Sequence, residues 1–264
     1  MKAIILAAGL GNRLLPLTED KPKCLIEFSG KTLLDRLLKT FKSGGINDIV
    51  LVIGHKSEKI KNVDLNLVKN EKYSKTGIMH SLFCAKEKLE KTVIVSYGDI
   101  IFENSVLEKL LESKYDITAV VDKKWEKYWK LRTDKPLSDA ESLLMDEKNF
   151  ITNIGEKNLK DFDKICGQFI GLIMFQNKGL NDLKDFFRKI FYETSKESNP
   201  LNPNVPFEQS TLTNFLQGMI MNGHKIKAIP IENGWLEFDT VKDLEIYNKM
   251  LTNNTLSDFI NIQD

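Results

Sequence analysis

The sequence predicts an α/β fold: a single three-layer domain with a mostly parallel central sheet. The alternation of two kinds of segment along the chain indicates this fold. Short apolar runs rich in Val and Ile, typical of strands buried on both faces, alternate through the first half of the chain with segments of helical spacing. That alternation is the pattern of parallel β-α-β units with right-handed crossovers. The 264 residues, of which 42% are hydrophobic, are enough for one such domain with an ordinary core.

The expected strands are apolar and β-branched, and glycine or polar residues end them. They cover residues 2–8, 49–53, 65–68, 92–95, 117–121, 142–145, 150–154, 168–175 and 225–229. The expected helices carry apolar residues three and four positions apart. They cover residues 32–41, 57–61, 79–89, 105–111, 180–191, 208–220 and 241–251. The segment 70–77 between them reads as a loop.

The composition argues against several classes of partner. Lys and Arg number 38 and Asp and Glu number 37, so the net charge of +1 gives no reason to expect nucleic acid or an anionic membrane as partner. No apolar run approaches the ~18–20 residues of a membrane span, and the first residues lack a signal-peptide layout. The 3 cysteines form no C-x-x-C pair, which argues against a disulfide framework or a thiolate zinc site. We therefore expect a cytoplasmic protein.

The first expected strand runs directly into a glycine loop that carries two cations. Gly9 and Gly11 would let backbone N–H groups approach a phosphate without a Cβ in the way. Arg13 adds a planar fork for phosphate oxygens, and Lys23 adds a mobile point charge. A dinucleotide-binding fingerprint would need glycine where Leu14 stands, and a Walker loop would need Gly-Lys-Ser/Thr four residues after a glycine. Neither motif is present, so the stretch predicts a polyphosphate clamp of a different kind.

Residues 1–27 resemble a known signature. The stretch L-A-A-G-x-G-x-R, followed after a short interval by P-K, is similar to that of the nucleotidyltransferases that activate phosphorylated small molecules, the sugar-phosphate nucleotidyltransferase-like superfamily. The resemblance implies an enzyme with a Rossmann-like three-layer domain. An acceptor phosphate would attack the α-phosphorus of a nucleoside triphosphate and release pyrophosphate. A reaction between two anions needs cations on the developing charge and Mg²⁺ on hard carboxylate ligands.

Two aspartates are candidates for the Mg²⁺ ligands. Asp99 follows the strand expected at 92–95, and Asp239 lies in the stretch W-L-E-F-D-T. In the superfamily, one aspartate after the fourth or fifth strand and one late aspartate hold the metal, and the resemblance assigns these places to Asp99 and Asp239. The residues alone leave other roles open. Asp99 also suits a turn, and Asp239 also suits the N-cap of the helix from Val241, unless Thr240 caps it.

The resemblance also implies roles in binding the nucleotide. Lys23 would contact the transferred phosphate and Arg13 the β- and γ-phosphates, so the expected catalytic residues are Arg13, Lys23, Asp99 and Asp239. His80 is not assigned as a catalytic base, because an ionised phosphate nucleophile needs none. Its position is equally compatible with the surface of a helix. The residues expected to bind the nucleotide are Leu6, Ala7, Ala8, Gly9, Gly11, Arg13, Lys23 and Ser81.

The segment 122–141 is charged and aromatic and shows neither a clean helical nor a clean strand period. Aromatic faces beside carboxylates suit a cationic ammonium group, through cation–π contacts and ion pairs. Trp125 and Trp129 lie four apart, a spacing equally compatible with two rings packed on the core. Arg132 would hold a phosphate or phosphonate. The residues expected to bind the acceptor are Asp122, Trp125, Trp129, Arg132, Asp139 and Glu141.

A second pattern points to one branch of the superfamily. The arrangement V-V-D-x-x-W-x-x-x-W-x-x-R-x-x-x-P-L-x-D-A-E, followed by G-Q-F-I-G-L, resembles the cytidylyltransferases that act on small amino-phosphonates or phospho-amines. This implies Mg²⁺-dependent transfer of CMP from CTP to a small phospho- or phosphono-compound with an amine, for decoration of a capsule or cell-surface polymer. Phosphoglutamine and 2-aminoethylphosphonate are the favoured acceptors, with phosphocholine as a further candidate.

Two alternatives and the expected organisation complete the prediction. A sugar-1-phosphate nucleotidyltransferase that uses UTP, dTTP or GTP is the first alternative. A non-catalytic nucleotide-binding regulatory protein is the second, and it predicts the loss of Lys23 or of one of the two aspartates, all of which are present. We expect a monomer or homodimer. One domain would span residues 1–252, with an acceptor-binding subregion at 122–175, and residues 253–264 would form a polar, frayed tail.

Overall fold

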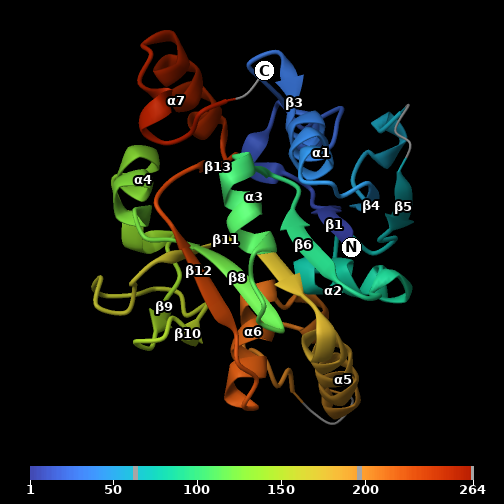
Figure 1. Ribbon diagram of the computed structural model, residues 1–264. Helices are drawn as coiled ribbons and strands as arrows, with labels where there is room; N and C mark the ends of the chain where they lie inside the picture. The colour runs from blue at the N-terminus through green and yellow to red at the C-terminus, as the bar shows by residue number, and fades with distance from the viewer. Residues whose placement is uncertain (62–64, 195–197, 263–264) are drawn as a thin grey trace.

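The computed structural model describes residues 1–61, 65–194 and 198–262. Its centre is a seven-stranded sheet in which one strand, β11, runs antiparallel to both of its neighbours and the other pairs are parallel (Figure 1). The predicted α/β fold with a mostly parallel sheet is confirmed. In order across the sheet, the strands are β12 (Lys227–Ile231), β8 (Ile117–Asp122), β11 (Gln168–Phe175), β6 (Val93–Tyr97), β1 (Lys2–Ala7), β4 (Asp48–Ile53) and β5 (Asn66–Lys69).

Helices cover both faces of this sheet and make the predicted three layers (Figure 1). Because side chains alternate along a strand, Ile5 of β1 belongs to one apolar cluster and Ile4 to the other. The first cluster holds residues of α1 (Leu33–Ser43), α3 (Asn104–Leu111), α4 (Trp125–Arg132) and α7 (Val241–Thr252). The second cluster holds residues of α2 (Ile78–Cys84), α5 (Asn177–Thr194) and α6 (Leu212–Met221).

The described residues also form three two-stranded sheets, and one of them positions expected site residues. They pair β2 (Glu27–Phe28) with β3 (Lys31–Thr32), β9 (Leu143–Met145) with β10 (Ile151–Ile154), and β7 (Ile100–Phe102) with β13 (Trp235–Glu237). The last pair is antiparallel, with Glu237 opposite Ile100, and the Phe238 N–H donates to the Asp99 carbonyl at 2.9 Å. This pairing brings the late stretch W-L-E-F-D-T to the end of β6.

The segment 122–141, which shows no clean period in the sequence, contains α4 (Trp125–Arg132). Trp125, Tyr128, Trp129 and Arg132 are its buried residues, and their spacing of three, four and seven marks one helical face. The helical pattern was not recognised in the sequence because this face ends in an arginine and its neighbours in the sequence include lysines. Asp122 precedes the helix and accepts a hydrogen bond from the Lys124 N–H at 2.8 Å.

Other boundaries differ by a turn. The helix expected at 79–89 ends at Cys84 and continues as a 3₁₀ turn at Lys86–Lys88, and the segment expected at 57–61 is a 3₁₀ turn, Ser57–Lys59. The helix expected at 208–220 is divided into a 3₁₀ turn, Phe207–Gln209, and α6, which Thr211 caps.

The C-terminal segment is not frayed over the part that the structure describes. Leu256, Phe259 and Ile260 are each at most 6% exposed and belong to the first cluster. The Asn261 N–H donates to Glu103 Oε1 at 2.7 Å. These contacts attach the segment to the domain that we expected to end at residue 252. Within the described ranges, no helix has the length and apolar character needed to cross a bilayer.

Candidate active site

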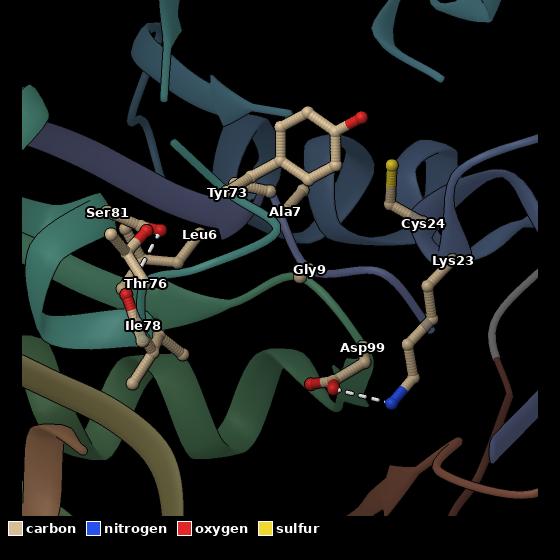
Figure 2. A pocket seen from close by; sticks show the side chains of 13 residues that line it. Leu6, Ala7, Gly9, Lys23, Cys24, Tyr73, Thr76, Ile78, Ser81 and Asp99 are labelled. Atoms are coloured by element: carbon tan, nitrogen blue, oxygen red, sulfur yellow. Dashed lines mark hydrogen bonds and ion pairs between the residues drawn. The ribbon is translucent and has the colours of Figure 1, made fainter. Parts of the chain in front are cut away.

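Two cavities meet at the carboxyl edge of the sheet, beside the ends of β1 and β6. The chain leaves β1 towards β4 on one side and later returns to β6 on the other, so this is a switch point where α/β sheets bind ligands. We call the first cavity, of about 130 Å³, the glycine-loop pocket (Figure 2). It is lined by Leu6, Ala7, Ala8, Gly9, Lys23, Cys24, Tyr73, Thr76, Gly77, Ile78, Ser81, Gly98 and Asp99.

The glycine loop is anchored from outside the pocket. Gly11 has a φ of 68°, which favours glycine, and Thr18 Oγ1 donates to the Gly11 carbonyl at 2.9 Å. The His55 N–H donates to the Ala8 carbonyl at 3.2 Å. Gly9 lines the pocket, and a Cβ there would meet nothing within 4 Å. The backbone of Gly9 is therefore open to a ligand, whereas Gly11 and Arg13 lie outside the lining of this pocket.

A buried hydroxyl network forms the wall opposite the loop. The Asn70 side-chain amide donates to Thr76 Oγ1 at 2.9 Å and to Ser81 Oγ at 3.0 Å. Asn70 is 1% exposed and Ser81 is 6% exposed, so both hydroxyl groups are held in place. The structure thus puts the predicted residue Ser81 at the pocket. Sequence reasoning missed Thr76, although its hydroxyl in a loop before a helix was a usable signal.

Cations and carboxylates from three distant segments meet at the mouth of the pocket. Lys23 Nζ lies 2.7 Å from Asp99 Oδ2, as Figure 2 shows, and 3.0 Å from Asp239 Oδ1. One guanidinium nitrogen of Arg13 lies 2.6 Å from Asp239 Oδ2. Thr240 caps α7, so the Asp239 carboxylate is not used as the N-cap. The four residues expected to be catalytic therefore form one cluster.

The charges around Lys23 and Asp239 favour the ionised form of both residues. Burial alone would lower the pKa of Lys23, but the Asp99 and Asp239 carboxylates outweigh it and raise that pKa. Burial would raise the pKa of Asp239, but Lys23 and Arg13 outweigh it and lower that pKa. Burial raises the pKa of Glu237 to about 7, against the neighbouring Arg132 guanidinium and with the help of the aspartates.

The two aspartates fit a Mg²⁺ ion that also binds phosphate. Asp99 Oδ1 is buried without a hydrogen-bond partner in the described part of the chain, and Lys23 already draws the two carboxylates to one point. The described residues contain no group of three or more metal-ligating side chains. Mg²⁺ is commonly held by one or two carboxylates, with substrate phosphates and water as its other ligands. A pair of aspartates beside a phosphate clamp matches that requirement.

The second cavity, of about 270 Å³, adjoins the first at Asp99, and we call it the carboxylate cleft. Of the residues expected to bind the acceptor, Trp129, Asp139 and Glu141 line this cleft. Trp129 Nε1 is buried without a hydrogen-bond partner among the described residues. The cleft is lined by Arg13, Ile78, Tyr97, Asp99, Trp129, Asp139, Glu141, Lys157, Gln168, Phe169, Ile170, Thr211, Thr213, Trp235, Glu237 and Asp239.

Three residues expected to bind the acceptor lie outside the cleft, and those predictions are wrong. Asp122 is 0% exposed and accepts hydrogen bonds from Trp235 Nε1 at 2.9 Å and from backbone N–H groups. Arg132 forms ion pairs with Asp243 at 2.9 Å and Glu237 at 2.8 Å. Trp125 packs edge-on against the Trp129 ring. Asp122 lies just before α4, and Trp125 and Arg132 lie on its buried face. All three side chains therefore support the wall of the cleft from inside the domain.

Sequence reasoning missed several residues that line the cleft. Trp235 and Glu237 precede Asp239 by four and two positions, and Tyr97 precedes Asp99 by two. Trp235 and Glu237 share one face of β13 because strand residues two apart do so, and the nearby aspartates were the signal for these neighbours. Gln168 stands in the stretch G-Q-F-I-G-L that carried the resemblance to one branch, although no role was assigned to it. Lys157 gave no comparable signal, because it comes from a segment far away in sequence.

Comparisons with known proteins identify the family of the chain. Residues 3–152 match the MobA-like NTP transferase domain. The chain is similar to a CTP:phosphoglutamine cytidylyltransferase of Campylobacter jejuni, with 37% identity covering 93% of this chain and 98% of that protein. It is similar to a choline-phosphate cytidylyltransferase of Streptococcus pneumoniae, with 37% identity covering 44% and 52%. A solved CTP:phosphocholine cytidylyltransferase from Streptococcus pneumoniae shares the fold, with a TM-score of 0.74 at 23% identity, covering 95% and 98%.

The family match spans more than half of the chain, and the Campylobacter jejuni relative aligns along nearly all of it. The resemblance drawn from the N-terminal signature is thereby confirmed. The chain belongs to the MobA-like NTP transferase family and is a nucleotidyltransferase.

Proposed function

We propose that the protein is a Mg²⁺-dependent cytidylyltransferase that transfers CMP from CTP to a small phospho- or phosphono-compound bearing an amine. The observation that carries the proposal is the direct junction of the Lys23 clamp with the carboxylate cleft at Asp99. Phosphoglutamine and 2-aminoethylphosphonate are the favoured acceptors, and phosphocholine is a further candidate. The name of the Campylobacter jejuni relative supports CTP and phosphoglutamine.

The reaction follows from the charges at the junction. An oxygen of the acceptor phosphate forms a bond to the α-phosphorus of CTP, the bond from that phosphorus to the β-phosphate oxygen breaks, and pyrophosphate leaves with the electron pair. Lys23 and Arg13 offset the repulsion between the two anions and the charge that develops on the α-phosphate. The nucleophile is already ionised at neutral pH, so no residue has to remove a proton.

Asp99 and Asp239 would hold Mg²⁺, which when bound would neutralise charge on the phosphates and orient them. The residues of the chain have separate tasks. The Ser81 wall and the backbone at Gly9 bind the nucleoside side of CTP, and the cleft binds the acceptor. Holding both substrates in line supplies the orientation on which such phosphoryl chemistry depends.

The lining of the cleft supports an acceptor with an amine. Five Asp and Glu side chains line it together with the aromatic rings of Tyr97, Trp129 and Trp235, against two cations among the described residues. Carboxylates and aromatic faces attract an ammonium group, which a sugar phosphate lacks. We place this activity in the cytoplasm of a cell that decorates its capsule or surface polymer, in a monomer or homodimer with no nucleic-acid or membrane partner.

The proposal is tested by pyrophosphate release with and without Mg²⁺, using CTP, UTP, dTTP, GTP and ATP against one panel of acceptors. The panel holds phosphoglutamine, 2-aminoethylphosphonate, phosphocholine, glucose-1-phosphate and mannose-1-phosphate. We expect Mg²⁺-dependent turnover with CTP and an amine-bearing acceptor. Turnover with a sugar phosphate and UTP, dTTP or GTP would replace the proposal with a sugar-1-phosphate nucleotidyltransferase. No turnover in any combination would favour a non-catalytic nucleotide-binding protein.

A further inference from the structure

The carboxylate cleft contains an ion pair that includes neither of the expected metal ligands. Lys157 Nζ lies 3.3 Å from Glu141 Oε1, and both residues line the cleft. The Lys157 side chain is 62% exposed, whereas the Glu141 side chain is 22% exposed. Such an exposed pair contributes little to stability, commonly ~0–1 kcal/mol. The ion pair is therefore of interest for its position in the cleft and not for its contribution to the stability of the fold.

Glu141 is held in place by a buried residue of the central sheet. Gln168 of β11 is 4% exposed, and its side-chain amide donates to the Glu141 carbonyl at 2.5 Å. The Glu141 N–H donates to Gln168 Oε1 at 3.2 Å. This pair of amide hydrogen bonds fixes the backbone of Glu141 beside the cleft. The carboxylate is thus presented from a rigid support, while the long Lys157 side chain can adjust its position.

The two cations among the described residues of the cleft have different partners. Arg13 contacts Asp239 at 2.6 Å and Asp139 at 3.8 Å, so it is engaged with an expected metal ligand. Among the described residues that line the cleft, Lys157 is then the cation available for a second anionic group of the acceptor. Its neighbour Glu141 is available for an ammonium group.

We infer that Lys157 and Glu141 together bind the α-carboxylate and α-ammonium groups of an amino-acid acceptor. This inference rests on the proposed function and narrows it. Glutamine phosphorylated on its side-chain amide has both groups, whereas 2-aminoethylphosphonate and phosphocholine have a cationic nitrogen and no carboxylate. Lys157 is therefore the residue that selects a phosphorylated amino acid over the other two acceptors.

The test measures binding by calorimetry in the presence of Mg²⁺ and a CTP analogue that cannot be cleaved. The probes are phosphoglutamine and its decarboxylated counterpart, 4-aminobutanamide phosphorylated on the amide. Lys157→Gln should weaken phosphoglutamine binding about tenfold, the low end for a charged hydrogen bond at a half-exposed site, and should leave the decarboxylated probe unchanged. Lys157→Arg should keep most of the affinity. Lys164→Gln is the matched control, because Lys164 pairs with Glu156 at 3.0 Å on the same loop and does not line the cleft.

The binding results either overturn or support the role of Lys157 and Glu141. Equal binding of the two probes by the unmodified protein, equal effects of Lys157→Gln and Lys164→Gln, or no binding of phosphoglutamine would overturn it. A carboxylate-specific loss confined to Lys157→Gln would support it. The proposed function fails by a different result: binding of phosphoglutamine with no release of pyrophosphate when CTP replaces the analogue.

Discussion

Lys23 is the residue on which the proposed chemistry depends most. Its ammonium group contacts Asp99 at 2.7 Å and Asp239 at 3.0 Å, and its side chain is 15% exposed. Lys23→Met removes this charge with little change in length. Loss of one pre-positioned donor to a developing oxyanion commonly costs about 10²–10³ in kcat, or about 2.7–4 kcal/mol. We expect a decrease in kcat of that size, measured by pyrophosphate release under saturating CTP and acceptor.

The same substitution has an expected effect on stability. Without Lys23, the Asp99 and Asp239 carboxylates face each other with only Arg13 to offset one of them. We expect the melting temperature to fall, and Mg²⁺ to raise it more in Lys23→Met than in the unmodified protein, because the ion no longer competes with the ammonium group. Lys21→Met is the control, since Lys21 lies on the same loop and lines neither cavity. A kcat within about threefold of the unmodified value would refute the role of Lys23.

Three further predictions concern the metal, the acceptor and the support of the cleft. Asp99→Asn should abolish turnover at every Mg²⁺ concentration, and a variant with unmodified activity in a Mg²⁺ titration would contradict the metal assignment. Trp129→Leu keeps an apolar side chain but removes the aromatic face, so we expect the KM for the acceptor to rise about threefold to tenfold with that for CTP unchanged. Equal changes in both KM values would indicate a packing role alone. Arg132→Met leaves Asp243 and Glu237 without their cation, and urea unfolding should show a loss of about 3–5 kcal/mol. A loss below about 1 kcal/mol would contradict the view of Arg132 as a structural residue.

The parts of the site that depend on local sequence could be predicted. Gly9 follows a strand of apolar residues, and the strand and loop form where the pattern indicates. Asp99 could be placed at the same edge because parallel strands end together. The segment β11 was predicted with its observed bounds, since its apolar run is long and ends at polar residues. In each case the determining interactions lie within a few residues of the chain.

The parts that depend on long-range pairing could not be predicted from the residues alone. Asp239 reaches Asp99 through the pairing of β13 with β7, and β7 is too short to show a strand period. Arg132 was assigned to the acceptor because its guanidinium group suits a phosphate or phosphonate. It is buried because Asp243, over a hundred residues later, supplies the opposite charge. Lys157 was missed for the related reason that its loop reaches the cleft only in the folded chain.

We propose above all that the site around Lys23 and Arg13 transfers the CMP group of CTP and not its terminal phosphate. The most direct measurement follows phosphorus labels from α-labelled and γ-labelled CTP with Mg²⁺ and phosphoglutamine. We predict that the α-label appears in a CDP-linked product of the acceptor and the γ-label in pyrophosphate, with both signals lost in Asp99→Asn. Transfer of the γ-label to the acceptor, or release of labelled pyrophosphate without a CDP-linked product, would contradict the claim.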